Sequence, residues 1–186
     1  MRRVGSSPLT VELETSLQNP LTNSNHELSH VSQMLVAGRP ITFGTEGNYG
    51  SWAVHGWSQD KDQSDITWLD GHVASLEFVM AVPPTDLLLV VRMMPLSIEG
   101  PRQQQLYIYL NGLFVDLWTP AAKEFREYST LLRKTFFSKE SINLLTLAAP
   151  NAISPAESGL GPDQRTLSFA IMQVRLQNPT RISRPA

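Results

Sequence analysis

Apolar and polar residues alternate with a period of two along most of the chain beyond its first forty residues. In residues 72–82, Leu76 and Phe78 fall on one face of an extended chain and Glu77 falls on the other, which is typical of a half-buried strand. Residues 86–94 are apolar on both faces except for one arginine, so we expect a central strand that is covered on both sides. The pattern therefore predicts a protein built mainly from β-strands.

A hairpin is predicted where residues 103–110 and 113–118 flank Asn111-Gly112. Both central residues of a type I′ turn need a positive φ, which asparagine and glycine adopt more readily than other residues. Asn-Gly between two alternating apolar runs is therefore a strong hairpin signal, and the turn fixes the register in which the two strands pair.

Near the start of the chain, the apolar residues recur at a different spacing. Leu28, Val31 and Leu35 recur at helical spacing. Asn25 precedes them as a candidate N-cap, and Gly38 follows them as a stop signal. These residues predict one short helix before the first strand.

The remaining segments complete an all-β fold. Further strands are expected at residues 41–44, 51–57, 142–148 and 166–176, and a helical turn at residues 129–134. Many short strands joined by glycine- and proline-containing turns indicate an antiparallel β-sandwich, a galactose-binding-like jelly roll with one or two short helices. We expect a flexible polar arm over residues 1–25, a single sandwich domain over 26–178 that includes the short helix, and a frayed tail over 179–186.

Composition narrows the classes of function. The 186 residues are 41% hydrophobic and 17% charged, which is enough apolar material to bury a core. The net charge of −2 gives no bulk attraction to nucleic acid or anionic lipid, and the absence of cysteine excludes disulfides and a cysteine nucleophile. Because we find no signal peptide and no apolar stretch of membrane-spanning length, we expect a cytoplasmic location. The oligomeric state is left open.

One short motif has the spacing of a zinc site. In His26-Glu27-x-x-His30, two imidazoles on one helix face could bind Zn²⁺ while the glutamate activates a water. A catalytic zinc also needs a third protein ligand, and Gln33 and Val36 occupy the glycine and histidine positions of the extended motif. We therefore rank a zinc hydrolase last and expect neither a metal nor another cofactor, with the histidines facing water.

Two tryptophans bracket an acidic loop. Trp57 precedes it, Trp68 follows it, and Asp60 and Asp62 lie between them. Exposed indoles can stack on sugar rings while carboxylates bind hydroxyl groups, so this segment is a candidate glycan platform. The alternative is that both indoles close one end of the sandwich. We expect Trp68, which is followed by polar residues, to be the more exposed of the two.

A second candidate segment is a loop rich in glycine, proline and serine over residues 153–165. It ends in Asp163-x-Arg165, whose side chains can form an ion pair that holds the turn. The same two side chains could instead contact a ligand.

Five motifs follow one another within residues 41–176: Gly56-Trp57-Ser58, Trp68-x-Asp70-Gly71-x-x-Ala74-x-Leu76, Gln105-x-Tyr107-Ile108-x-Leu110-Asn111-Gly112, Pro150-x-Ala152-x-Ser154-Pro155 and Gly161-x-Asp163-x-Arg165-x-Leu167. In this order they resemble a jelly-roll module of bacterial surface-polysaccharide biosynthesis proteins, where similar modules are often attached to glycosyltransferases. The resemblance implies a β-sandwich that is not itself the transferase. The chain differs from that family at residues 59–65, a loop that usually runs into a Trp-Gly-x-Trp-like stretch.

We therefore predict a non-enzymatic carbohydrate-binding or accessory module in bacterial polysaccharide assembly. The candidate ligand contacts are Trp57, Asp60, Asp62, Trp68, Asp163 and Arg165. The alternative is a protein–protein scaffold that docks onto a glycosyltransferase complex. An aromatic stripe with polar neighbours would favour a glycan ligand, whereas a broader apolar patch would favour a docking face.

Overall fold

The structure, a computed structural model, describes residues 32–59, 65–97, 103–121 and 123–179. The chain divides into two units, Met1–His30 and Val31–Ala186, and all described residues belong to the second. The strands of this part are β1 (Ile41–Thr42), β2 (Ala53–His55), β3 (Thr67–Asp70), β4 (Val73–Val79), β5 (Leu87–Pro95), β6 (Leu106–Leu110), β7 (Leu113–Trp118), β8 (Arg126–Leu132), β9 (Ile142–Ala148) and β10 (Leu167–Gln177).

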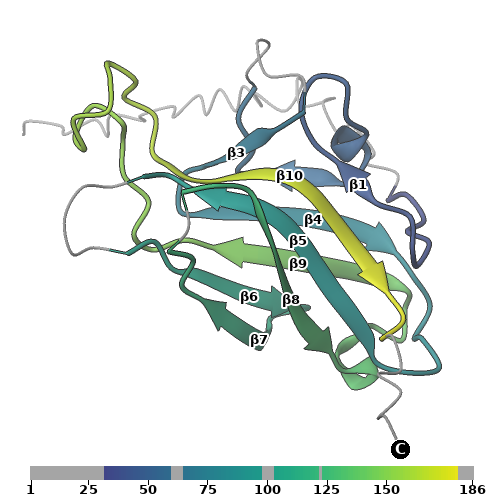
Figure 1. Cartoon of the computed structure of the whole chain (residues 1–186). Helices are drawn as coiled ribbons and strands as arrows, with labels where there is room; N and C mark the ends of the chain where they lie inside the picture. Colours follow the sequence, from purple (N-terminus) through teal and green to yellow (C-terminus); the bar gives the residue numbers. More distant parts are fainter. Residues whose placement is uncertain (1–31, 60–64, 98–102, 122, 180–186) are drawn as a thin grey trace, which may run out of the picture. The chain divides into compact units, whose positions relative to one another are not determined.

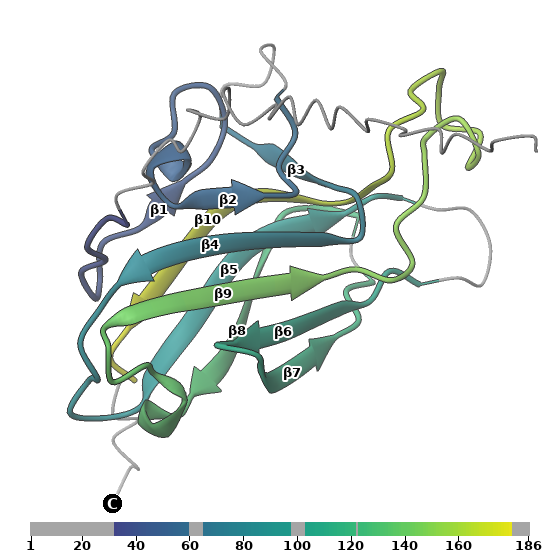
Figure 2. The same cartoon turned by 180° about the vertical axis from the view of Figure 1, so that it is seen from behind.

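These strands form two five-stranded antiparallel sheets. Sheet A has the order β2-β4-β9-β6-β7, and sheet B has the order β1-β10-β5-β8, with β3 also paired to β10. Figure 1 looks onto sheet B, and Figure 2, from behind, looks onto sheet A. Between successive described strands the chain crosses to the other sheet each time except at the β6–β7 hairpin. The predicted jelly-roll sandwich is confirmed.

The core lies between the two sheets and follows the alternation seen in the sequence. Alternate residues of β4, β6, β5 and β10 point inward and are nearly inaccessible, among them Leu76, Phe78, Leu106, Ile108, Leu89, Met93, Ile171 and Val174. The intervening residues face outward, as a pleated strand requires. Because one face of each sheet is buried, the side chains at the alternate positions of each strand lie on the outer face of that sheet.

The β6–β7 hairpin is confirmed at the predicted residues. Asn111 and Gly112 have φ values of 52° and 77°, as a type I′ turn requires. Leu110 pairs directly with Leu113, and a bulge follows between Ile108 and Tyr109. The turn therefore fixes which residues of β6 face outward.

Strand β5 is central, as predicted, between β10 and β8. No second layer of strands covers its outer face in the described part of the chain, yet Val90 is only 4% exposed. Arg175 of β10 lies opposite Val90 and reaches Glu127 of β8 with two hydrogen bonds of 2.9 and 3.0 Å. The stem of Arg175 thereby crosses β5, which accounts for the burial of Val90.

Both helical predictions need correction. Residues 32–36 are not helical, and Met34 forms a bridge with Val79; the first half of the expected helix lies outside the described residues. Ser129–Leu132 lies in β8, and a 3₁₀ helix follows at Lys134–Phe136. In both places a neighbouring strand supplies backbone partners that override weak local helical spacing. Strand β3, for which no strand was predicted, also forms by pairing with a neighbouring strand, β10.

Candidate functional site

Strand β6 presents two tyrosines on the outer face of sheet A. Leu106, Ile108 and Leu110 are fully buried, so the alternating Tyr107 and Tyr109 must point outward, and both are half-buried there. Their spacing of two residues puts both rings on one surface.

The register surrounds these tyrosines with small and weakly polar neighbours. Tyr107 lies opposite Ala148 of β9, and Ala148 lies opposite Val73 of β4. Tyr109 lies opposite Thr146 in the next row. We call the surface formed by Val73, Tyr107, Tyr109, Thr146 and Ala148 the tyrosine face; Figure 2 views the sheet from this side.

A hollow of about 360 Å³ lies over the end of the tyrosine face where β9 leaves the sheet. Its lining consists of His72, Val73, Tyr107, Tyr109, Ala148 and Pro150. Ala148 leaves room between the larger side chains because it ends at Cβ. The hollow is therefore a consequence of one small residue between two tyrosines and an exposed valine.

His72 supplies a hydrogen-bonding group at the rim of the hollow. Its Nδ1 lies 3.3 Å from the carbonyl oxygen of Ala149, which can only accept, so Nδ1 carries the proton. The Nε2 atom of the neutral ring is then an acceptor. The backbone N–H of Ala149 also donates to the His72 carbonyl at 2.7 Å, which fixes this residue against β9.

A serine–histidine contact lies beside the tyrosine face. Ser75 Oγ is 3.0 Å from His55 Nδ1, but Ser75 is fully buried. A nucleophile must reach its substrate, and this hydroxyl is covered. The pair therefore holds β2 against β4 and is not placed for catalysis.

Trp57 lies in the core and offers no open ring face. It is 7% exposed, its ring centroid is 5.0 Å from that of Phe43, and its Nε1 donates to the Ser75 carbonyl at 2.9 Å. The prediction that Trp57 is the more buried of the two indoles is confirmed. Its position favours the alternative interpretation, in which this indole closes the sandwich.

The residues on either side of Trp57 also have structural roles. Gly56 has a φ of 78°, and a methyl group added there would overlap the carbonyl oxygen of Val73. Ser58 is bonded to Trp68 twice, through its N–H to the Trp68 carbonyl at 3.0 Å and through Oγ, which accepts the Trp68 N–H at 3.2 Å. The Gly-Trp-Ser motif therefore fixes the connection between β2 and β3.

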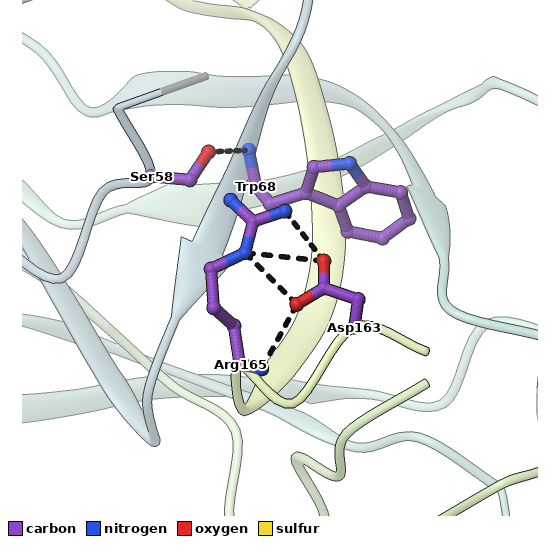
Figure 3. Close-up of polar contacts among 4 residues, drawn as sticks. All are labelled: Ser58, Trp68, Asp163 and Arg165. Carbon is purple, nitrogen blue, oxygen red and sulfur yellow. Dashed lines mark hydrogen bonds and ion pairs between the residues drawn. The ribbon is translucent and has the colours of Figure 1, made fainter. Parts of the chain in front are cut away.

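Trp68 is half-buried on β3, in the neighbourhood of the Asp163–Arg165 pair (Figure 3). The backbone brings these segments together, because Asp70 pairs with Leu167 and the Gly71 N–H donates to the Thr166 carbonyl at 2.6 Å. The structure thus places Trp68 near two of the other predicted contacts, while its backbone lies beside the segment that carries Trp57.

Asp163 and Arg165 form the expected ion pair. Arg165 Nε lies 3.1 Å from both carboxylate oxygens of Asp163, and the Arg165 backbone N–H donates to Oδ1 at 2.9 Å (Figure 3). The hydrogen bonds from the Arg165 side chain, and then the one from its backbone, lower the pKa of Asp163 to about 2. This carboxylate therefore stays charged and holds the loop down to acidic pH.

Several predicted site residues lie outside the described part of the chain. These are Asp60, Asp62 and the zinc-type motif His26-Glu27-x-x-His30. Among the described residues, no group of three or more histidines, aspartates or glutamates is placed to hold a metal ion. The described part also contains no helix long and apolar enough to cross a membrane.

Tyr107 and Tyr109 were missed as site candidates, although both stand in the predicted strand. The signal was present in Leu106-Tyr107-Ile108-Tyr109-Leu110, where aliphatic residues alternate with tyrosines. This alternation puts the tyrosines on the open face if the aliphatic side chains fill the core. His72 could not have been found this way, because the register of β4 against β9 brings it to the hollow.

No protein family and no curated protein matches the sequence. Among solved structures, the fold is similar to part of BtGH115A, a family GH115 4-O-methyl-alpha-glucuronidase with specificity for decorated arabinogalactans, at 9% identity and a TM-score of 0.48. That likeness covers 97% of this chain and 20% of the glucuronidase, so the chain spans about a fifth of that protein.

Two smaller domains are similar over nearly their full length. The CBM36-1 domain of a multidomain xylanase from the hindgut metagenome of Trinervitermes trinervoides has 8% identity and a TM-score of 0.46, and the match covers 76% of this chain and 97% of that domain. The C-terminal CBM6 of LamC, a marine laminarinase from Zobellia galactanivorans, has 8% identity and a TM-score of 0.45, and the match covers 75% of this chain and 98% of that module. At these values the likenesses assign neither a family nor a ligand to this chain.

Proposed function

We propose that this chain is a non-catalytic carbohydrate-binding module whose main ligand surface is the tyrosine face. The observation that carries the proposal is the pair of outward tyrosines, Tyr107 and Tyr109, beside a hollow of about 360 Å³ on an open sheet. Pockets for small ligands begin at roughly this volume.

The chemistry of the surface suits a sugar ring. One side of a pyranose ring is lined by C–H groups and its rim carries hydroxyls. The phenol rings of Tyr107 and Tyr109 supply apolar faces for the C–H side, and their hydroxyls can bond to the rim. The His72 Nε2 acceptor and the Thr146 hydroxyl add polar groups at the border.

Trp68 is proposed as a second contact at the same end of the sandwich. Its half-buried ring lies near the Asp163–Arg165 pair, and the loop that carries this pair begins beside Pro150, which lines the hollow. In this proposal the ion pair supports the loop, and a longer glycan reaches from the tyrosine face toward Trp68.

The wider setting that we propose is an accessory role in bacterial polysaccharide assembly. It rests on the ordered motifs that resemble modules of surface-polysaccharide biosynthesis proteins. Of these, Gly56-Trp57-Ser58 and Asp163-x-Arg165 have structural roles that a shared fold would require. The proposed partner of the bound glycan is a glycosyltransferase complex.

A second candidate function, docking onto such a complex, is favoured by apolar side chains on the same face. Phe114 is 53% exposed and lies opposite Tyr109, and Leu117 is 38% exposed and lies opposite Tyr107. Together with Val73 they widen the apolar surface beyond what a sugar ring needs. This function predicts protein binding that does not compete with free glycans.

The two functions are separated by calorimetric titration of the protein with a panel of neutral bacterial oligosaccharides. Tyr107→Ala and Tyr109→Ala should each weaken glycan binding by about 1–3 kcal/mol, by analogy with the stacking of nucleobases on aromatic side chains. Tyr107→Phe should retain most of the affinity because it keeps the ring. Leu131→Ala, an exposed position on sheet B, is the matched surface control. Binding that survives removal of both tyrosines, or no binding to any glycan, would contradict the proposal.

A further inference from the structure

A second hollow, of about 390 Å³, lies where the segment before β1 runs beside the end of β4. The Leu35 N–H donates to the Val79 carbonyl at 3.0 Å, and the Val79 N–H donates to the Gln33 carbonyl at 2.9 Å, which holds this segment against the sheet. The hollow shares no lining residue with the one over the tyrosine face. It is therefore a separate site.

One wall of this hollow contains a buried donor without an acceptor. Trp52 lines the hollow and is 7% exposed, and its indole Nε1 is buried with no hydrogen-bond partner in the described structure. Because this nitrogen is inaccessible to solvent, a ligand in the hollow would meet other atoms of the Trp52 ring and not this donor.

Asn48 supplies a hydrogen-bond donor. Its Oδ1 accepts the Thr42 backbone N–H at 2.8 Å and the Thr42 hydroxyl at 3.3 Å. The carboxamide orientation follows from these bonds, because a backbone N–H needs an acceptor. The two N–H bonds of Asn48 Nδ2 are thereby left to donate at the edge of the hollow.

One charged side chain, that of Arg39, is present among the described lining residues. It makes no ion pair in the part of the chain that the structure describes, and none of the described lining residues is acidic. A guanidinium group binds a carboxylate through two parallel hydrogen bonds. Met34, Leu35 and the Trp52 ring supply an apolar wall beside these donors.

We infer that this hollow binds the carboxylate of an acidic sugar, with Arg39 and Asn48 donating to the carboxylate and Trp52 contacting the ring. The inference rests on the proposed function in taking a glycan as the ligand, and it adds a charged subsite. The Arg39 guanidinium and the Asn48 Nδ2 group are both donors and favour an oxyanion, and the apolar wall favours an oxyanion attached to a ring over a free inorganic anion.

The test is a calorimetric titration of the full chain with methyl β-D-glucuronide and methyl β-D-glucoside, which differ at the carboxylate. The glucuronide should bind about tenfold more tightly, and Arg39→Gln should remove that advantage. Asn48→Asp keeps an acceptor for Thr42 but replaces the donor with a negative charge, so it should also abolish the preference. Arg133→Gln, an equal change of charge at an exposed position outside the hollow, should have no effect.

Inorganic phosphate distinguishes a general oxyanion site from a sugar-acid site. Phosphate that competes as strongly as the glucuronide would overturn the inference, and so would equal affinity for the two glycosides. A glucuronide preference that depends on Arg39 but persists in Tyr107→Ala would support it. Neutral glycan binding that depends on Tyr107, without a preference for the acid, would leave the proposed function intact and remove only this site.

Discussion

Asn111 Nδ2 donates a 3.0 Å hydrogen bond to Asn143 Oδ1 and so joins the β6–β7 turn to the start of β9. Asn111 also donates to the Phe136 carbonyl at 2.8 Å and accepts the Leu144 N–H at 2.8 Å. Asn143 is 1% exposed and accepts the Ser138 N–H. Because β9 pairs with β6, this network fixes the strand that carries the two tyrosines.

Replacing Asn111 with alanine should therefore destabilise the protein by about 2–4 kcal/mol, from a left-handed conformation without its preferred residue and from buried groups left unpaired. Asn111→Gly should lose less, about 1–3 kcal/mol, because glycine accepts the positive φ. Urea denaturation measures both. Equal losses of unfolding free energy in the two variants would show that the positive φ of residue 111 does not affect stability.

Three glycines form a graded series for substitution by alanine. Gly50 has open space and no positive φ, so the change should be within about 0.5 kcal/mol. Gly112 has open space but a φ of 77°, which should make the loss about 1–2 kcal/mol. At Gly56 a methyl group also meets the Val73 backbone, so the loss should reach about 3 kcal/mol or more. Thermal unfolding in any other order would contradict the assigned turn geometry.

Replacing each of the two tryptophans should have different effects on folding stability and on glycan binding. Trp57→Ala opens a cavity in the core and should cost about 3–5 kcal/mol of folding free energy. Trp68→Ala, at a half-buried position, should cost about 1–2 kcal/mol and weaken binding of longer glycans. Denaturation curves and glycan titrations of both variants provide the comparison. A large stability loss at Trp68 with unchanged affinity would remove it from the proposed site.

The acid dependence of stability should reflect the Asp163–Arg165 pair. The folded-state pKa of Asp163 is about 2, below the unfolded value of roughly 3.9. A lowered folded-state pKa stabilises the protein fully above the unfolded value, and this contribution disappears as the pH falls through the folded value. The stability difference between the parent and Asp163→Asn should therefore be constant from pH 7 to about 5 and shrink toward pH 2. A difference that persists unchanged at pH 2 would contradict this assignment.

Strong, local signals in the sequence predicted most of the sandwich. Asn111-Gly112 determined a hairpin because only a few residues adopt its φ values, and the runs at β4, β5, β9 and β10 had clear apolar faces. Strands β3 and β8 lack such a face because they are short or lie at the border of a sheet. Their extended conformation comes from pairing with β10 and β5, which local sequence does not encode.

The candidate site was harder to predict because it depends on register. Tyr107, Ala148 and Val73 lie far apart in sequence and meet only through the pairing of β6, β9 and β4. The Trp57 indole was ambiguous because the same residue type fills cores and stacks on sugars. The Asp163–Arg165 pair was predictable because its two side chains are neighbours in sequence.

The central claim is that a glycan lies on the tyrosine face, and the most direct measurement is a titration of ¹⁵N-labelled protein followed by amide chemical shifts. With the neutral glycan that binds most tightly, the amides of Tyr107, Tyr109, Ala148 and His72 should shift in proportion to occupancy. The chemical shift of the Trp57 indole N–H, which is hydrogen-bonded inside the core, should not change. Shifts confined to the outer face of sheet B, or no shifts with any glycan at millimolar concentration, would contradict the account.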